Sequence, residues 1–340
     1  MSRLKPYKLG FLLLPDFSYF GLIAAIQPLF LANWRAQRQV FSWVTLSADG
    51  LPVRASNGSA IAVDTALSSR QQLQTLLVLA CFDPKQHVSE TRLRSALVRV
   101  AAGGVEMGGI ETGSEVLAAA GLLDGRTAAV HWENLDGFRE RYPKVSAKDH
   151  LYHVTPGRLT CAGGTAVIDM MLYVVARQAG QTLSDEVAHE MLVGRPRPST
   201  HRQLLEDDMS DSNELVRAAI ALMGKNLDEP LRMGEIARRL NVSARQLRRH
   251  FRKSMGATTT RYYVTLRLSR AHNLLEQTNL SVTEVAITSG FRSLEHFSRA
   301  YRSAFGCAPS SDRRQSITAP IHHHQRQPRA SSRLRSNSKP

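Results

Sequence analysis

The feature that most constrains this chain is a pattern of short helices that occurs twice near its C-terminus. The first copy is EIARRLNVSARQLRRHFRKSMG (Glu235–Gly256), and the second is EVAITSGFRSLEHFSRAYRSAFG (Glu284–Gly306). Each copy combines a small residue for close helix crossing, a residue suited to a left-handed turn and a serine that can cap a second helix. These positions are, in order, Ala237, Asn241 and Ser243, then Ala286, Gly290 and Ser293. The spacing predicts two helix-turn-helix units.

Local signals support both units. Ser243 and Gln246 form a capping box, which predicts where the second helix of the first unit begins. Apolar positions at helical spacing predict two small cores, formed by Ile236, Leu240, Leu247 and Phe251 and by Val285, Phe297 and Tyr301. A single helix hairpin is a common motif. Two copies joined by the helical stretch RYYVTLRLSRAHNLLEQTN are a much more specific signal.

The positive charge of the chain is concentrated in the same region. Residues 1–212 contain 21 Lys and Arg and 21 Asp and Glu, whereas residues 213–340 contain 23 and 8. The second part therefore carries the whole net charge of +15. Such asymmetry is typical of a surface that binds a polyanion, most often nucleic acid, although a basic solvated surface would give the same count.

Each predicted second helix presents three polar residues on one face, because positions i, i+3 and i+4 are neighbours on a helix. Arginine can donate two hydrogen bonds to guanine, and glutamate can accept one from cytosine. The alternative is contact with phosphate, which positions the protein without reading the sequence. The candidate DNA-binding residues are Arg245, Arg248 and Arg249 in the first unit and Glu295, His296 and Arg299 in the second.

The first 195 residues have a different pattern. Short apolar runs such as KLGFLLL and TLLVLAC alternate with amphipathic stretches, which predicts an α/β domain with a mostly parallel sheet flanked by helices. We expect an effector-sensing domain at 1–195, a linker at 196–212, the all-α DNA-binding domain at 213–315 and a disordered basic tail at 316–340. His322–His324 lie in that tail without partner ligands, so no metal site is expected.

The stretch GGIETGSEVLAAAGLLDGRTAAVHW (Gly108–Trp132) is similar to a nucleophile elbow, in which a strand, a sharp Gly-flanked turn and a helix expose one side chain above the sheet. Glu111 occupies that position, which we expect to be exposed. A second strand, Thr127 to Trp132, is expected to bring His131 to the same edge. The turn is therefore predicted without a cysteine or serine nucleophile.

Three widely spaced cysteines, Cys81, Cys161 and Cys307, argue against a disulfide framework and for a reducing compartment. Pro15 and Asp16 interrupt the first apolar run too early for a signal peptide, and the next run is too short to span a membrane. These features predict a cytoplasmic protein that is not bound to a membrane. No cofactor is expected.

The C-terminal region, residues 213–314, resembles the AraC/XylS family of transcription regulators, and FRSLEHFSRAYRSAFGCAP resembles the family signature. The resemblance implies that the two recognition helices enter successive major grooves of promoter DNA. It also implies that the six candidate residues occupy base-reading positions. The partners that it implies are RNA polymerase, a small-molecule effector and a second copy of the chain in a homodimer.

The N-terminal region resembles the ThiJ/PfpI, class I glutamine amidotransferase-like fold, and the domain order resembles GlxA-type regulators. The segments that carry this resemblance are GFLLLPDFSYFGLIAAI, ETGSEVLAAAGLLDGRTAAVHWE and TCAGGTAVIDMMLYVVA. Enzymes of this fold have a cysteine at the elbow, paired with histidine and often with an acid from the first helix. Here Glu111 replaces the cysteine, and no carboxylate occurs between Asp16 and Asp49. The resemblance therefore favours a binding domain that is not an enzyme.

Open α/β sheets usually bind ligands at the carboxyl ends of their strands. The candidate ligand-binding residues there are Glu111, Thr112, His131, Trp132 and Glu133. A carboxylate beside an indole suits a cation, and the resemblance implies effectors such as arginine, glycine betaine or carnitine. Two alternative roles remain open: Trp132 as a tryptophan of the core and Glu133 as a solvated glutamate. The alternative function is an amidohydrolase or amidotransferase-type enzyme with a nucleic-acid tether.

Overall fold

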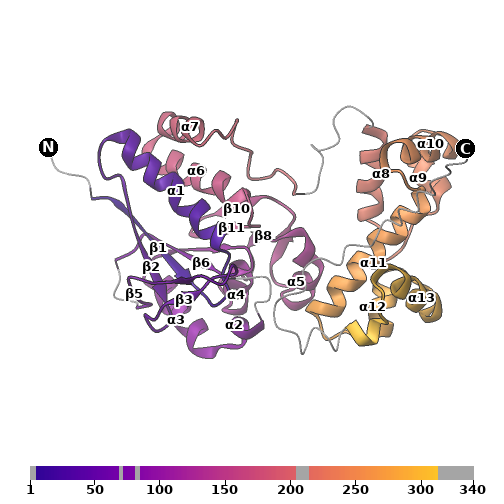
Figure 1. The fold of residues 1–340 in the computed structure, drawn as a ribbon, viewed down its shortest axis with the longest axis horizontal. Coiled ribbons are helices and arrows are strands. Elements are labelled where there is room, and N and C mark those ends of the chain that lie inside the picture. The colour runs from indigo at the N-terminus through magenta and orange to yellow at the C-terminus, as the bar shows by residue number, and fades with distance from the viewer. Residues whose placement is uncertain (1–4, 69–71, 81–84, 204–213, 313–340) are drawn as a thin grey trace, which may run out of the picture. The chain divides into compact units, whose positions relative to one another are not determined.

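The computed structural model describes residues 5–68, 72–80, 85–203 and 214–312 (Figure 1). The chain divides into two compact units, residues 1–204 and 205–340, and each is described here by itself. The predicted tail at 316–340 and most of the predicted linker lie outside the described residues.

A seven-stranded sheet forms the centre of the first unit, with the order β10-β11-β7-β6-β1-β2-β5. Its neighbours pair in parallel except at one edge, where β10 and β11 are antiparallel. The strands are β1 (Tyr7–Leu13), β2 (Phe41–Ser47), β5 (Thr65–Ala66), β6 (Thr75–Leu79), β7 (Glu106–Ile110), β10 (Tyr152–Thr155) and β11 (Arg158–Cys161). Two small sheets pair β3 (Val53–Arg54) with β4 (Ala60–Ile61), and β8 (Thr127–Ala129) with β9 (Ser146–Lys148).

Helices cover both faces of this sheet (Figure 1). One face is covered by α1 (Tyr19–Ala36), α6 (Ala166–Ala179) and α7 (Gln181–Glu190). The remaining helices of this unit are α2 (Lys85–Ser89), α3 (Thr91–Ala102), α4 (Gly113–Ala119), the short 3-10 helix η1 (Trp132–Asn134) and α5 (Leu135–Arg141). Successive strand residues alternate between the two cores. In β6, Leu77 and Leu79 pack in the core under α1 and α6, whereas Leu76 and Val78 pack in the core with α3 and α4. The predicted α/β class, with a mostly parallel sheet flanked by helices, is confirmed.

The carboxyl ends of four parallel strands are in register. Leu13 of β1 pairs with Leu79 of β6, Leu79 with Ile110 of β7, and Ile110 with Cys161 of β11. The loops that follow these strands therefore start side by side along one sheet edge. This edge is where the elbow at residue 111 lies.

The second unit is entirely helical in its described part, as expected. Its helices are α8 (Glu214–Gly224), α9 (Met233–Arg239), α10 (Ala244–Met255), α11 (Thr259–Gln277), α12 (Val282–Thr288) and α13 (Leu294–Phe305). One core includes Ile236, Leu247 and Phe251, and a separate core includes Val285, Phe297 and Tyr301. The two predicted small cores are thus confirmed, with α11 contributing to both.

Candidate functional site

The recognition helix of the first helix-turn-helix unit, α10, is fixed by local signals. Asn241 adopts φ 54°, the left-handed conformation that the turn requires. The Ser243 hydroxyl accepts a hydrogen bond from Gln246 N at 3.1 Å, and the Gln246 side chain accepts one from Ser243 N at 2.9 Å. The predicted capping box is therefore present.

The charged face of α10 is free to meet a partner. Leu247 and Phe251 are buried, whereas Arg245, Arg248 and Arg249 are exposed. The Nε of Arg248 donates to Ala244 O at 3.2 Å within the helix. In the described part of the chain, the side chain of Arg249 has no hydrogen-bond or ion-pair partner. An exposed, unpaired arginine next to a rigid helix surface suits contact with DNA bases or phosphates.

The second recognition helix, α13, repeats this arrangement. Ser293 caps it by accepting from His296 N at 3.3 Å, and Phe297 and Tyr301 anchor its inner face. Glu295, His296 and Arg299 are exposed on the outer face. The Oε1 atom of Glu295 lies 3.8 Å from Nη1 of Arg299 in a solvent-exposed ion pair. Because such pairs contribute little free energy, a nucleic acid can compete for the arginine at low cost.

The connecting helix α11 holds the second helix-turn-helix unit in place through Arg267. Its guanidinium lies 4.0 Å from the centre of the Phe291 ring and donates to the carbonyls of Ser289 and Gly290. Gly290 has φ 77°, and a Cβ there would lie 2.4 Å from Leu227 O. Only glycine fits this turn, as the sequence pattern predicts.

The α/β unit, residues 1–204, contains the predicted elbow. Strand β7 ends at Ile110, Glu111 adopts φ 55°, and α4 begins at Gly113. A Cβ at Gly109 would lie 2.3 Å from Ser114 N, and one at Gly113 would lie 2.0 Å from Val78 O. These two close approaches force the sharp turn, and residue 111 carries its strain.

The Glu111 side chain is half-buried, which differs from the expectation of an exposed side chain. Ser18 and the backbone N–H of Gly164 donate hydrogen bonds to it, and burial raises the pKa of Glu111 above its ordinary value of 4.5. Its Oε2 atom is buried and has no hydrogen-bond partner among the described residues. A Cβ at Gly163 would lie 2.2 Å from the Glu111 Cγ. The segment 163–164 thus covers the elbow, and sequence spacing does not reveal this contact.

Ser18 is a site residue that the sequence analysis did not identify. It caps α1, since its hydroxyl oxygen accepts from Gly21 N at 3.1 Å, and the same hydroxyl donates to Glu111. The carboxylate therefore comes from the elbow and the hydroxyl from the start of the first helix. A serine before an apolar helical run is a recognisable cap signal, but its second contact depends on the tertiary fold.

The predicted strand to Trp132 is wrong beyond Ala129. Strand β8 ends there, and His131 instead precedes the short helix η1 and accepts from Glu133 N through Nδ1 at 3.4 Å. Burial lowers the pKa of His131, while the nearby charge of Glu133, whose Oε2 lies 3.7 Å from Nδ1, opposes this change. Trp132 is 39% exposed, so it is not a core residue.

The predicted ligand-binding residues therefore form two groups. At the elbow Thr112 is buried and Glu111 is half-buried, whereas at η1 His131 is half-buried and Trp132 and Glu133 are exposed. No hydrogen bond or ion pair joins Glu111 to His131 in the described structure. Cys161, at the end of β11, is fully buried, and burial raises its pKa to about 12. Its thiol is protonated at neutral pH and is a poor nucleophile.

The start of the predicted linker is docked on the first unit. The Arg197 guanidinium contacts the buried Asp169 carboxylate at 2.7 and 3.1 Å and the Thr165 hydroxyl at 2.9 Å. The Gln203 side chain accepts from Trp132 N at 2.9 Å and donates to Val130 O at 2.8 Å. This docked linker segment, residues 197–203, therefore contacts both the helix that follows the Gly163–Gly164 turn and the His131–Trp132 segment. The sequence offers no signal for these contacts.

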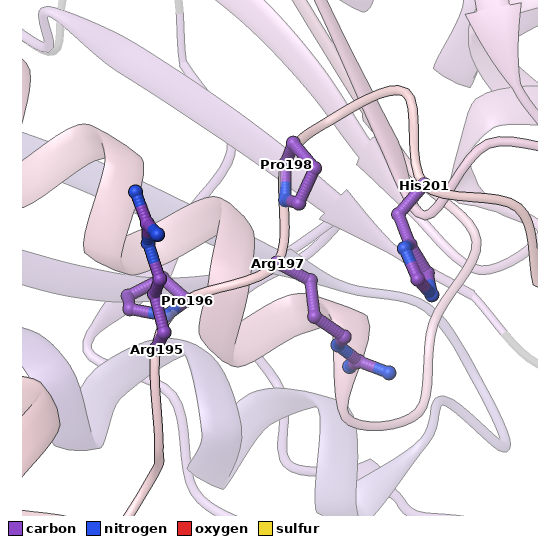
Figure 2. Close-up of a pocket in the computed structure, with 5 residues that line it drawn as sticks. All are labelled: Arg195, Pro196, Arg197, Pro198 and His201. Atoms are coloured by element: carbon purple, nitrogen blue, oxygen red, sulfur yellow. The ribbon is translucent and has the colours of Figure 1, made fainter. Parts of the chain in front are cut away.

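Two pockets lie beside this segment. One, of about 480 Å³, is lined by Arg195, Pro196, Arg197, Pro198 and His201 (Figure 2). The other, of about 430 Å³, is lined by residues 195–198, by Tyr152 of β10 and by residues of α6 and α7 that include Asp169 and Tyr173. In Figure 2 the side chains of Arg197 and His201 extend to the same side, away from that of Arg195. Neither pocket is lined by the five predicted ligand-binding residues.

Comparison with known sequences identifies both units. A helix-turn-helix domain family model matches residues 236–315. The HTH-type transcriptional regulator CdhR of Pseudomonas aeruginosa is 43% identical over 305 residues, which cover 89% of this chain and 90% of that protein. The HTH-type transcriptional regulator GlxA of Rhizobium meliloti is 32% identical over 313 residues, with 91% and 96% covered.

Solved structures agree with this assignment. An AraC family transcriptional regulator from Pseudomonas putida is 29% identical, with a TM-score of 0.51, over 55% of this chain and 100% of its own. A ThiJ/PfpI family protein from Pseudomonas syringae, 20% identical with a TM-score of 0.50, covers 65% of this chain and 88% of its own, and shares the fold. No helix among the described residues is long and apolar enough to cross a membrane. The near full-length relatives, the paired helix-turn-helix units and the elbow-containing sheet together place this chain in the AraC/XylS family of transcription regulators, within its GlxA type.

Proposed function

We propose that the protein is a one-component regulator that binds promoter DNA in the cytoplasm as a homodimer and contacts RNA polymerase there. The observation that carries the DNA-binding part is the set of exposed polar residues on α10 and α13, each held above a buried apolar face. Arg249 is assigned to base reading because its side chain has no partner among the described residues and faces outward from a capped helix.

We further propose that the first unit binds a cationic effector through Glu111. A buried carboxylate without a cation beside it is costly, and a ligand cation would offset that cost. Glu111 meets this description, since its Oε2 has no partner among the described residues and burial raises its pKa. Arginine, glycine betaine and carnitine are the ligand class to test. Because Oε2 is buried, a ligand can reach this oxygen only if the Gly163–Gly164 segment or Ser18 moves.

Direct hydrolysis is not part of this proposal. The elbow residue is a glutamate, and Cys161, at the end of the neighbouring strand β11, is kept protonated by burial. Thr112 and His131 to Glu133 are proposed as secondary contacts that respond when the elbow is occupied. The regulators CdhR and GlxA share the two-domain organisation over most of their lengths, which supports a regulatory role for this chain.

The DNA-binding proposal is tested with the full chain and an operator selected from a random duplex library. We expect affinity to fall steeply with salt, because arginines displace counterions from DNA. Arg249→Ala should weaken operator binding by about 1–3 kcal/mol, the typical value of a bidentate base contact, and weaken binding to random DNA much less. Arg217→Ala, on α8 outside the recognition helices, is the matched charge control. Equal losses on both DNAs would show that Arg249 contacts only phosphate.

A further inference from the structure

The cover over Glu111 and the docked linker segment are attached to the same turn of the chain. Gly163 and Gly164, called here the glycine pair, adopt φ 103° and 54°. Gly163 packs against the Glu111 Cγ, and the N–H of Gly164 donates to the Glu111 carboxylate. The carbonyls of the pair accept hydrogen bonds, at 3.2 and 3.3 Å, from the first two N–H groups of α6. The glycine pair therefore forms both the cover over Glu111 and the start of α6.

Arg197 fastens the docked linker segment to the start of α6. Its Nη2 donates to Thr165 Oγ1 at 2.9 Å, directly after the glycine pair, and to Asp169 Oδ2 at 2.7 Å, one turn further along the helix. The backbone N–H of Arg197 donates to Asp169 Oδ1 at 2.8 Å. Asp169 is 3% exposed, and hydrogen bonds between charged groups are stronger than neutral ones. The start of α6 is thus held both by Glu111, through the glycine pair, and by Arg197.

The far end of the docked linker segment is connected with the same turn by a second route. Leu151 N donates to His201 O at 2.9 Å, and Leu151 O accepts from Ala162 N, also at 2.9 Å. Ala162 directly precedes the glycine pair. Gln203 N donates to Asp149 O at 3.0 Å, which holds the last described residue of the segment against the same strand-to-strand connection. Hydrogen bonds therefore link the segment with the residues immediately before and after the glycine pair.

From these contacts we infer that the docked linker segment is a latch, which stays docked while the glycine pair covers Glu111 and is released when a ligand at Glu111 lifts the pair. The two groups over the carboxylate differ in their freedom to move. Ser18 is tied to the first turn of α1 by its cap bond, whereas a Cβ on Gly164 would meet no atom within 4 Å, so the glycine pair borders open space. A ligand therefore displaces the pair, the start of α6 moves with it, and Thr165 separates from Arg197.

Release of the latch lengthens the chain between the two units. With the segment docked, ten residues, 204–213, lie between Gln203 and the start of α8. Release frees residues 194–203 as well, which adds ten more, because Val193 N is still held by Ala188 O at the end of α7. Ten residues span at most about 33–36 Å, so the greatest distance that the chain can bridge increases by up to that amount. This inference rests on the proposed effector site and assigns the route by which its occupancy reaches the linker.

The test measures hydrogen exchange in the full chain by mass spectrometry, following the amides of residues 197–203. Gly163→Ala imitates a bound ligand, because its Cβ would lie 2.2 Å from the Glu111 Cγ and forces the pair off the elbow. Exchange in 197–203 should become at least 10-fold faster, the effect of losing one hydrogen bond to a charged group. Gly164→Ala is the matched control: its backbone is also left-handed, but its Cβ points into open space, and exchange should stay within about twofold of the wild type. Circular dichroism confirms that both variants are folded.

A second variant tests the coupling in the opposite direction, because coupling between two sites is reciprocal. Arg197→Met leaves the glycine pair intact, yet it should speed exchange both in 197–203 and at the first turn of α6, residues 164–168. Arg35→Met, which breaks the exposed ion pair with Glu186, should change neither region. An Arg197→Met variant that loosens only the linker, or a Gly163→Ala variant that leaves 197–203 as in the wild type, would overturn the latch.

The last arm separates the latch from the effector proposal. Arginine, glycine betaine and carnitine are added to the wild type, with binding measured by calorimetry on the same samples. A compound that binds should speed exchange in 197–203, and bound ligand with unchanged or slower exchange there would overturn the latch while leaving the effector site in place. If none of the three binds but Gly163→Ala and Arg197→Met act reciprocally, this ligand class is wrong and the latch stands.

Discussion

Replacing Glu111 by glutamine should have opposite effects on ligand binding and on stability. Glutamine keeps the length of the side chain and an oxygen that can accept from Ser18 and Gly164, but it removes the negative charge. Its amide group would replace Oε2, the oxygen without a hydrogen-bond partner among the described residues. The substitution therefore removes the charge of the carboxylate and leaves the known contacts in place.

The expected loss of affinity follows from that one oxygen. A hydrogen bond to a charged group contributes about 1.5–3 kcal/mol, so the Kd of arginine, whose guanidinium can donate, should rise about 10- to 150-fold. The quaternary ammonium of glycine betaine or carnitine has no N–H and is attracted by the negative charge alone, so its Kd should also rise. Isothermal titration calorimetry with arginine, glycine betaine and carnitine measures this directly. Glu190→Gln is the control, because Glu190 is an exposed carboxylate at the end of α7. An unchanged Kd in Glu111→Gln would refute the cation site.

The effect on stability has the opposite sign and depends on pH. Because burial raises the pKa of Glu111, the folded protein holds its proton more tightly than the unfolded chain does. Ionisation therefore destabilises the fold as pH rises from about 4.5, the ordinary value, through the folded-state pKa, and the full cost is present above it. Without ligand, Glu111→Gln should be more stable than the wild type at pH 8, and the difference should shrink toward pH 4.5. Urea unfolding at several pH values tests this, and a difference that does not vary with pH would contradict it.

Two other predictions concern the docked linker segment and the lost nucleophile. Arg197→Met leaves the buried Asp169 carboxylate without its cation, which should cost about 2–3 kcal/mol, allowing for the partial exposure of Arg197, and lower the Tm of the first unit by about 5–10 °C. Lys144→Met, which breaks the exposed pair with Asp124, should cost less than about 1 kcal/mol in the same calorimetric scan; equal shifts would contradict the argument. Glu111→Cys restores a thiol at the elbow, but the described residues that contact this position, Ser18, Gly163 and Gly164, include no base, so we expect slow alkylation and no measurable glutaminase turnover. Rapid turnover would show that His131 reaches the elbow.

The sequence predicts the DNA-binding unit well because its determinants are local. The turn at Asn241 and the capping box of Ser243 and Gln246 each depend on residues within a few positions of one another. The left-handed backbone at Gly290 favours glycine by itself, although the crowding around it comes from the distant Leu227 and Pro230. The outward position of the recognition residues then follows from helical spacing alone.

The effector site is predicted less well because its contacts join distant segments. The elbow itself follows from its glycines, but the cover over Glu111 comes from Ser18 and from residues 163–164. Likewise, alternation in TAAVHW suggests a strand up to Trp132, whereas Gln203, far along the chain, accepts the Trp132 N–H after the strand has ended. Such contacts appear only in the tertiary structure.

The geometry of the elbow also makes position 111 a suitable site for substitutions that change ligand preference. Its backbone is held by the close approaches of Gly109 to Ser114 and of Gly113 to Val78, which do not involve the side chain at 111. The conformation at φ 55° is one that asparagine, aspartate and glycine adopt readily. A small library at this one position would therefore vary the charge and size of the site on a constant scaffold. A reporter gene placed behind the operator would convert such a library into a search for biosensors with new ligand preferences.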